Sequence, residues 1–246
     1  MNNSSPTYIV VGATGGIGSA VSRLLSASGS NLVLAARTEQ PLQSLAADLG
    51  AVSRTVDATD YPQLQEVASF ARTEFGKIDG IVCCVGSILL KPAHLTSDEE
   101  FDETITVNLR TAFNTVKAGV RGMMSTGGSI VLCSSAVAQT GLANHEAIAA
   151  AKSGIIGLAR SAAATYAPRN IRVNCVAPGL TQTRMTSGLF ENEASLEASK
   201  SMHALGRLGQ PDDIASAIVW LLDPGNNWVT GQVIGVDGGL GQLRPR

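Results

Sequence analysis

A glycine-rich turn near the start of the chain has the residue types and the spacing of a phosphate-binding site. It follows the apolar run of residues 8–11 and reads GATGGIG over residues 12–18, a G-x-x-x-G-x-G pattern. Glycines permit a tight turn and let a pyrophosphate approach the backbone N–H groups at a helix start, which we expect at about Ile17. A plain strand-to-helix turn is the alternative. The predicted contacts are Gly12, Thr14, Gly15, Gly16, Ile17 and Gly18.

Two charged residues after the next two predicted strands could select the nucleotide. A carboxylate after the second strand usually binds the ribose 2′-hydroxyl of NAD, whereas an arginine accommodates the 2′-phosphate of NADP. Arg37 stands there, so NADP(H) is favoured over NAD(H), although Glu39 could still reach the ribose and Arg37 could be a solvated residue before a helix. Asp57 follows the third strand and could accept a hydrogen bond from an adenine amino group. An ordinary turn or capping aspartate is an equal alternative for Asp57.

The elements that must position these groups are short β-branched runs alternating with longer segments of helical period. We expect strands near 8–13, 31–36, 52–56, 79–85, 129–134, 171–176 and 232–236. We expect helices near 17–28, 39–48, 62–75, 98–124, 146–166 and 212–222. This order predicts one α/β domain over residues 1–246, with a doubly wound parallel sheet of about seven strands and helices on both faces.

One polar segment, residues 186–209, breaks this rhythm and contains only a short helical pattern. A long connection between the sixth strand and the last helix overhangs the ligand crevice, so the segment is predicted to be a lid that carries substrate-binding residues. His203 in this segment and His94 after the fourth strand are interpreted as exposed loop histidines. Trp220 and Trp228, which flank the end of the last helix, are interpreted as packing residues.

The composition excludes several classes of protein. A hydrophobic share of 44% with a charged share of 15% suits a buried sheet and excludes a disordered chain. The formal net charge is -2 and no basic cluster is present, which argues against a nucleic-acid partner. The longest apolar runs are too short to span a membrane. Residues 1–7 contain no Lys or Arg and no signal-type region follows them, so a cytoplasmic location is expected.

The four cysteines show no C-x-x-C spacing, so we expect buried free thiols rather than disulfides and no metal site. Cys83 and Cys84 are interpreted as core strand residues. Their sequence neighbours are not basic, so nothing in the sequence supports a redox role for them.

Further motifs follow in a fixed order after the glycine turn and Asp57. They are Val107-Asn108-Leu109, Ser134-Ser135, Lys152, the run IRVN at 171–174, Pro178-Gly179 with Thr183, RLGQPDDIA at 207–215, TGQ at 230–232 and VDGG at 236–239. In this order they resemble the short-chain dehydrogenase/reductase family, most closely its ketoacyl-carrier-protein-reductase-like members, over nearly the whole chain. The resemblance implies a Rossmann-like fold, a nicotinamide cofactor, and hydride transfer between the nicotinamide and a carbonyl or alcohol carbon. It also implies cofactor contacts from Gly86, Lys152, Pro178, Gly179, Thr181 and Thr183.

The resemblance further implies a catalytic set of Asn, Ser, Tyr and Lys, the last two spaced Y-x-x-x-K on one helix face. Asn108, Ser135 and Lys152 match three of these positions, but Ile148 occupies that of the tyrosine and cannot donate or accept a proton. As a hypothesis, protonated His145, three residues before Ile148, supplies the proton in its place. The alternative is that His145 is a polar residue of the first helical turn.

Two functions remain open from the sequence. The first is an NADP(H)-dependent oxidoreductase with an atypical catalytic set, acting on a small carbonyl or alcohol substrate. The second is a nicotinamide-nucleotide-binding protein that has lost catalysis and serves as a sensor or a partner subunit. Small residues along 146–166 allow close helix approach, and relatives commonly pair this helix, so a homotetramer or homodimer is expected; high helix propensity alone is the alternative.

Overall fold

Seven parallel strands form one sheet in the computed structural model, which describes residues 5–189 and 193–244. In spatial order they are β3 (Val52–Thr55), β2 (Asn31–Ala36), β1 (Thr7–Val11), β4 (Gly80–Cys83), β5 (Gly128–Cys133), β6 (Ile171–Pro178) and β7 (Val233–Val236). The strand order reverses between β1 and β4, which opens a crevice at their carboxyl ends. The predicted α/β fold with a doubly wound parallel sheet is confirmed.

Helices cover both faces of this sheet. They are α1 (Gly16–Ala27), α2 (Glu39–Leu49), α3 (Tyr61–Phe75), α4 (Asp98–Ile105), α5 (Thr111–Met123), α6 (Glu146–Tyr166), α7 (Glu193–Met202) and α8 (Pro211–Leu222). The buried side chains form two cores, because successive strand residues point to opposite faces. One core contains residues of α3, α5 and α6, and the other contains residues of α1, α2 and α8. Within the described ranges, no helix has the length and apolar character needed to cross a membrane.

The helix expected at 98–124 is interrupted in the structure. A π-helical turn, η2 (Thr106–Arg110), separates α4 from α5. The buried Asn108 side chain lies in this turn, where its Nδ2 donates to the Thr104 carbonyl at 2.9 Å and to Ser87 Oγ at 2.9 Å. An asparagine side chain that bonds the backbone four residues earlier disturbs the regular ladder, and π turns of this kind are frequent at functional sites.

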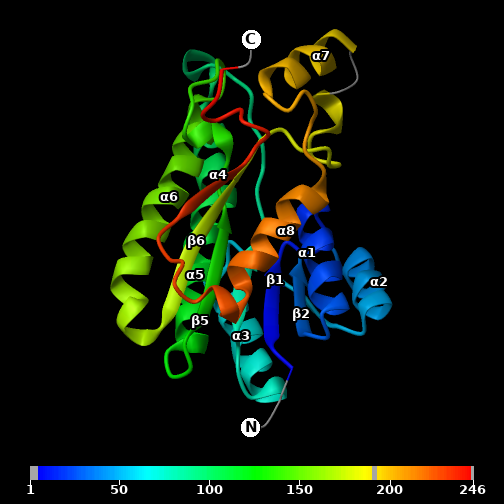
Figure 1. Ribbon diagram of the computed structural model, residues 1–246, viewed down its shortest axis with the longest axis vertical. Coiled ribbons are helices and arrows are strands. Elements are labelled where there is room, and N and C mark those ends of the chain that lie inside the picture. The colour runs from blue at the N-terminus through cyan, green and yellow to red at the C-terminus, as the bar shows by residue number, and fades with distance from the viewer. Residues whose placement is uncertain (1–4, 190–192, 245–246) are drawn as a thin grey trace.

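The segment 186–209 contains more structure than the sequence indicated. It includes the ten-residue helix α7, and its residues 190–192 lie outside the described part of the chain. Backbone bonds from Gln182 N to Gly209 O at 2.8 Å and from Gly209 N to Leu180 O at 2.9 Å join its two ends. Figure 1 shows α7 at the top of the view, beyond the carboxyl ends of the strands.

His203 ties this segment to the sheet, and the prediction of an exposed loop histidine is wrong. Its side chain is 2% exposed, Nε2 accepts from Leu180 N at 3.1 Å, and Nδ1 lies 2.7 Å from Ser199 O. A backbone N–H can donate only to an unprotonated ring nitrogen, so the ring is neutral and Nδ1 donates to Ser199. A Cβ on Gly179 would lie 2.8 Å from His203 Nε2, so the glycine makes room for the ring. His94, in contrast, is exposed as predicted.

We expect His203→Ala to lower the free energy of unfolding by about 1–3 kcal/mol, because it leaves the Leu180 N–H without its acceptor. Urea denaturation followed by circular dichroism measures this change. His94→Ala is the matched control and should change stability by less than about 0.5 kcal/mol, as surface substitutions usually do. Equal effects of the two substitutions would contradict the role given to His203.

Candidate dinucleotide-binding and catalytic site

A cavity of about 1030 Å³ lies at the carboxyl ends of β1, β4, β5 and β6, below the segment that contains α7. It brings together most of the residues predicted from the sequence. Those that line it are Thr14, Gly15, Gly16, Ile17, Gly86, Ser135, His145, Ile148, Lys152, Pro178, Gly179, Thr181 and Thr183. The apolar side chains of Met185, Leu189 and Met202 also line the cavity, as expected for a segment that faces the substrate.

Close packing explains the glycines of the turn. Gly12 has φ +83°, and a Cβ there would lie 2.9 Å from the Cys84 carbonyl carbon and from Val85 N. A Cβ on Gly18 would overlap the Gly12 carbonyl oxygen. Gly12 and Gly18 therefore pack on the side of the turn away from the cavity. Gly15, the N-cap residue of α1, and Gly16 and Ile17, its first two residues, line the cavity.

The start of α1 suits an anion. Among the described residues, no side chain caps this helix, and its first turn contains no acidic residue. The first N–H groups of a helix lack intrahelical partners and carry partial positive charge, so they attract a phosphate. The shape of the turn, its uncapped N–H groups and the size of the cavity fit a dinucleotide.

Arg37 and Asp57 lie outside the cavity lining, after β2 and β3. Hydrogen bonds from Thr59 N at 2.9 Å and Thr59 Oγ1 at 2.8 Å lower the pKa of the Asp57 carboxyl, and the Arg37 charge adds to this effect. Asp57 therefore stabilises a turn, which was one of the two interpretations. Glu39 Oε1 accepts from Gln43 Nε2 at 2.8 Å along α2. Arg37 is exposed, and its positive charge lies near enough to Asp57, after β3, to lower the pKa of that carboxyl.

Lys152 is a buried ammonium at the cavity wall. Its Nζ donates to the Cys133 carbonyl at 3.1 Å, and burial lowers the pKa of this side chain. A Cβ on Gly86 would lie 3.2 Å from Lys152 Nζ and 3.1 Å from Asn108 Oδ1. Gly86 thus separates Lys152 from Asn108, which lies behind the loop and does not line the cavity. Asn108 Oδ1 accepts from Ser87 N at 3.1 Å, so Asn108 holds this loop in position.

Two adjacent serines follow β5, and sequence reasoning gave a role to only one of them. Ser135 lines the cavity, and its Oγ accepts from Val137 N at 3.3 Å. The buried Ser134 donates from Oγ to the Lys152 carbonyl at 2.8 Å, which fixes α6 to the end of β5. The serine pair itself could have indicated this second role. Successive residues at a strand end point in opposite directions, so the two serine side chains face different ways.

His145 and Ile148 lie close together in sequence and line the same cavity. His145 is the N-cap residue of α6, and its Nδ1 lies 2.7 Å from the Ala143 carbonyl oxygen. A carbonyl can only accept, so Nδ1 carries a proton and Nε2 is the atom that gains or loses one. Ile148 is 3% exposed and lies one helical turn before Lys152 on the same face.

The cysteines agree only in part with the sequence prediction. All four are free thiols, and Cys83, Cys133 and Cys175 are buried. Cys84 is partly exposed, and it lines the cavity together with Cys133. Their neighbours in the sequence are not basic, but the fold brings the Lys152 ammonium to them.

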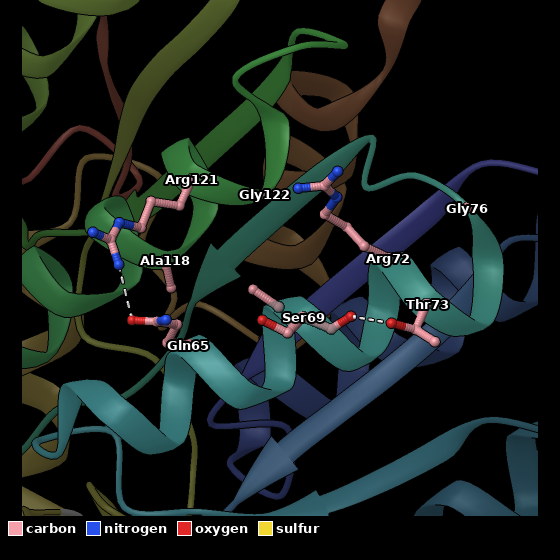
Figure 2. A pocket seen from close by; sticks show the side chains of 9 residues that line it. Gln65, Ser69, Arg72, Thr73, Gly76, Ala118, Arg121 and Gly122 are labelled. Atoms are coloured by element: carbon pink, nitrogen blue, oxygen red, sulfur yellow. Dashed lines mark hydrogen bonds between the residues drawn. The ribbon is translucent and has the colours of Figure 1, made fainter.

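A second, smaller cavity of about 380 Å³ lies between α3 and α5, and it contains none of the predicted site residues. Figure 2 shows Arg72 on one helix and Arg121 on the other, with Arg121 Nη1 donating to Gln65 Oε1 at 3.0 Å. This helix layer lies away from the carboxyl ends of the strands, so we assign the reaction site to the larger cavity.

Comparisons with known proteins agree with this geometry. Residues 12–241 match the family described as Enoyl-(Acyl carrier protein) reductase. The chain is 36% identical over 240 residues to the 3-oxoacyl-(acyl-carrier-protein) reductase FabG of Thermotoga maritima, an alignment that covers 94% of this chain and 96% of that one. It is also 36% identical over 239 residues to carbonyl reductase family member 4 of Danio rerio, with the same coverage.

Solved structures show the same fold over the whole chain. A short-chain type dehydrogenase/reductase from Mycobacterium ulcerans superposes with a TM-score of 0.92 at 28% identity, covering 98% of this chain and 91% of that one. The actinorhodin polyketide ketoreductase, solved with NADPH, superposes with a TM-score of 0.90 at 27% identity, covering 97% of this chain and 98% of that one. The fold, the glycine turn and the near-complete match to these sequences show that the chain belongs to the short-chain dehydrogenase/reductase family of oxidoreductases.

Proposed function

We propose that the protein is an NADP(H)-dependent oxidoreductase that interconverts a carbonyl and an alcohol, with Ser135, Lys152 and Asn108 in its catalytic set and His145 as the proton donor. The observation that carries this proposal is that Ser135, His145, Ile148 and Lys152 line one cavity with the glycine turn. Related proteins are named as reductases of a 3-oxoacyl group and of carbonyl compounds, and one neighbour was solved with NADPH.

The chain offers binding groups along the length of a dinucleotide. The N–H groups at the start of α1 would hold the pyrophosphate, and Gly86, Pro178, Gly179, Thr181 and Thr183 would surround the nicotinamide end. Arg37 would pair with the 2′-phosphate, and Asp57 would orient the adenine. When bound, NADPH supplies the hydride that the carbonyl carbon accepts.

Lys152 would hold the nicotinamide ribose. Its Nζ has one partner in the Cys133 carbonyl, and an ammonium has two further protons to donate to ribose hydroxyls. Asn108 would act indirectly by holding the loop of Gly86 and Ser87 against this site.

The proton would come from His145. Ser135 Oγ would bind the carbonyl oxygen and orient it, and His145 Nε2–H would donate a proton to that oxygen as the hydride arrives. Nδ1 remains bonded to Ala143 in both charge states, so the ring need not turn between the acid and the base form. In the reverse direction neutral Nε2 would accept the alcohol proton.

We expect His145→Gln to lower kcat/KM for carbonyl reduction by about 10²-fold or more, because a general acid contributes about 10² to 10⁴ in rate. NADPH affinity, measured by fluorescence titration, should stay within about twofold, because the substitution leaves the predicted cofactor contacts intact. His94→Gln, on an exposed residue, is the control. Unchanged turnover in His145→Gln would remove the proton-donor role.

Replacing Ile148 tests whether the rest of the set is competent. We expect Ile148→Tyr to raise kcat by about 10-fold or more, since it restores a phenol one turn before Lys152 in a site that otherwise keeps its groups. Ile148→Phe is the matched control, with the same ring and no hydroxyl, and it should not exceed the unmodified protein. Both rings are larger than the buried Ile148, so stability should fall by about 1–3 kcal/mol in each variant. Equal rates for the Tyr and Phe variants would contradict the proposal.

Arg37 is expected to set the preference for NADPH. Arg37→Glu should weaken NADPH binding by about 10-fold or more while leaving NADH binding the same or tighter, because a charge-assisted bond to the phosphate is replaced by repulsion. Isothermal titration of both nucleotides measures the ratio. Arg23→Glu, an exposed arginine within α1, controls for the change of net charge. An unchanged ratio would show that Arg37 does not contact the 2′-phosphate.

One observation favours a different function. Ile148 fills the position where the family's reaction needs a phenol, which is consistent with a nucleotide-binding protein that has lost catalysis and works as a sensor or partner subunit. NADPH consumption against a panel of ketones, aldehydes and imines separates the two functions. Tight NADPH binding without turnover of any substrate would favour the second.

We also propose a single domain over residues 1–246, with residues 186–209 acting as the lid, and assembly as a homodimer or homotetramer. Exposed aromatic side chains support the assembly, because large apolar groups on a surface often mark interfaces. Phe113 on α5 is 54% exposed and Trp228 is 96% exposed. The exposure of Trp228 also corrects its interpretation as a packing residue.

A further inference from the structure

Two cysteines face each other where β4 and β5 end. Cys83 is aligned with Leu132 in the parallel register, so Cys84 and Cys133 are the next aligned positions. Neighbouring strands lie about 4.7–4.9 Å apart, which falls within the range of Cα separations of about 4.4–6.8 Å that a disulfide spans. β4 ends at Cys83, so Cys84 lies just beyond the β4–β5 ladder, and its N–H donates to the Val11 carbonyl on the other side at 2.8 Å.

The two thiols are also on one face of the sheet. Cys133 belongs to the core formed with α1, α2 and α8, and Cys84 packs against that core. Cys83 and Cys175 belong to the opposite core. The Cys84 and Cys133 thiols lie close enough that each shifts the pKa of the other. Among the described cysteines, this pair alone lines the large cavity, with Cys84 partly exposed and Cys133 buried.

A buried cation lies next to Cys133. Lys152 Nζ donates to the Cys133 carbonyl at 3.1 Å. The hydrogen bond from Cys84 lowers the pKa of the Cys133 thiol, and the Lys152 charge contributes to the same effect. Its interaction with Cys133 as the donor, and then its burial, raise the pKa of Cys84. A reactive thiol next to a positive charge, with a second thiol in contact, is the arrangement found in redox-responsive cysteine pairs.

We propose that Cys84 and Cys133 form a redox-responsive dithiol that a hydroperoxide oxidises to a reversible disulfide in the wall of the cavity. The Cys133 thiolate attacks the peroxide oxygen, the O–O bond breaks, and Cys133 becomes a sulfenic acid as hydroxide leaves. The Cys84 thiol then attacks the Cys133 sulfur, forming the S–S bond and releasing water after proton transfer. Two thiols lose two electrons and two protons, and one hydrogen peroxide becomes two waters.

The bridge would change the cavity at two places that matter for binding. The Cys84 carbonyl carbon lies 2.9 Å from the Cβ position of Gly12, so Cys84 supports the back of the glycine turn. The Cys133 carbonyl holds Lys152. Drawing the two sulfurs together therefore displaces supports of both the turn and the ammonium, and the oxidised protein binds NADPH less tightly. This last consequence, like the NADPH protection tested below, rests on the proposed function.

The test counts thiols on the intact, reduced protein after treatment with a small molar excess of hydrogen peroxide. Denaturation with iodoacetamide and intact-mass analysis should show alkylation falling from four cysteines to two. The oxidised protein before alkylation should be lighter by two hydrogens, about 2 Da. A thiol reductant should restore all four sites, and a non-reducing digest should give a peptide that links residues 83–84 to residue 133.

Matched variants show which of Cys83 and Cys84 is joined to Cys133, because one peptide of the digest contains both. Cys83→Ser leaves Cys84 and Cys133 in place, so it should still form the disulfide and retain one alkylated thiol. Cys84→Ser and Cys133→Ser should each fail to form it. Four alkylated thiols after peroxide treatment of the unmodified protein would overturn the proposal, as would a bridge that survives in Cys84→Ser.

NADPH added before the peroxide should slow bridge formation several-fold, because the thiols line the cavity that it would fill. A bridge that forms at the same rate with and without NADPH would uphold the dithiol and count against the proposed cofactor site. If neither the unmodified protein nor any variant forms the bridge while NADPH binding is intact, the dithiol proposal is overturned and the cofactor site is upheld. The two proposals therefore fail separately.

Discussion

A buried ammonium with incomplete hydrogen bonding is the constraint on which the site depends. Lys152 lies on α6 beside the carboxyl end of β5. Removing its charge from water costs several kcal/mol unless polar groups replace the lost hydration. The structure supplies the Cys133 carbonyl for one of its three protons. Two further features hold the side chain in place: Ser134 fixes the Lys152 backbone to the end of β5, and the missing side chain of Gly86 leaves room for Nζ. A ligand with hydroxyl groups would accept hydrogen bonds from the remaining protons. Its binding would therefore offset part of the cost of burying the Lys152 charge.

Ile148 changes the chemistry of this arrangement without changing its shape. A phenol beside Lys152 would share its protons and titrate with it, whereas an isoleucine leaves the ammonium without an acidic neighbour on α6. The side chain is 3% exposed, so it also makes that part of the cavity wall apolar. In the proposed mechanism the proton therefore comes from outside this helix face. His145 is suitable because it precedes α6 as the N-cap residue, with Nδ1 fixed by Ala143 and Nε2 able to gain or lose a proton.

Sequence reasoning recovered the features that depend on local pattern. The β-branched runs gave all seven strands, and the helix 146–166 has the same bounds in the structure as in the prediction, because an apolar stripe repeats along it without interruption. The glycine turn was predictable, since its residues act through their own backbone. The break at Asn108 was not predicted: its bond to the Thr104 carbonyl is local, but nothing in the chain shows that the side chain turns inward, where it also bonds Ser87, which is distant in sequence. His203 was misjudged for the same reason: its partner Leu180 and the space above Gly179 exist only in the fold.

The arrangement of the thiols comes from the tertiary structure and could not be predicted from the sequence. Cys84 and Cys133 are nearly fifty positions apart, and neither has a basic neighbour in the chain. Parallel pairing of β4 and β5 places them together, and α6 brings Lys152 to both. One cation therefore takes part in both proposals: it would hold a ribose, and its charge lowers the pKa of Cys133. A ligand that accepts its protons would leave the same positive charge beside Cys133, so an occupied cavity would protect the thiols by covering them rather than by changing their acidity.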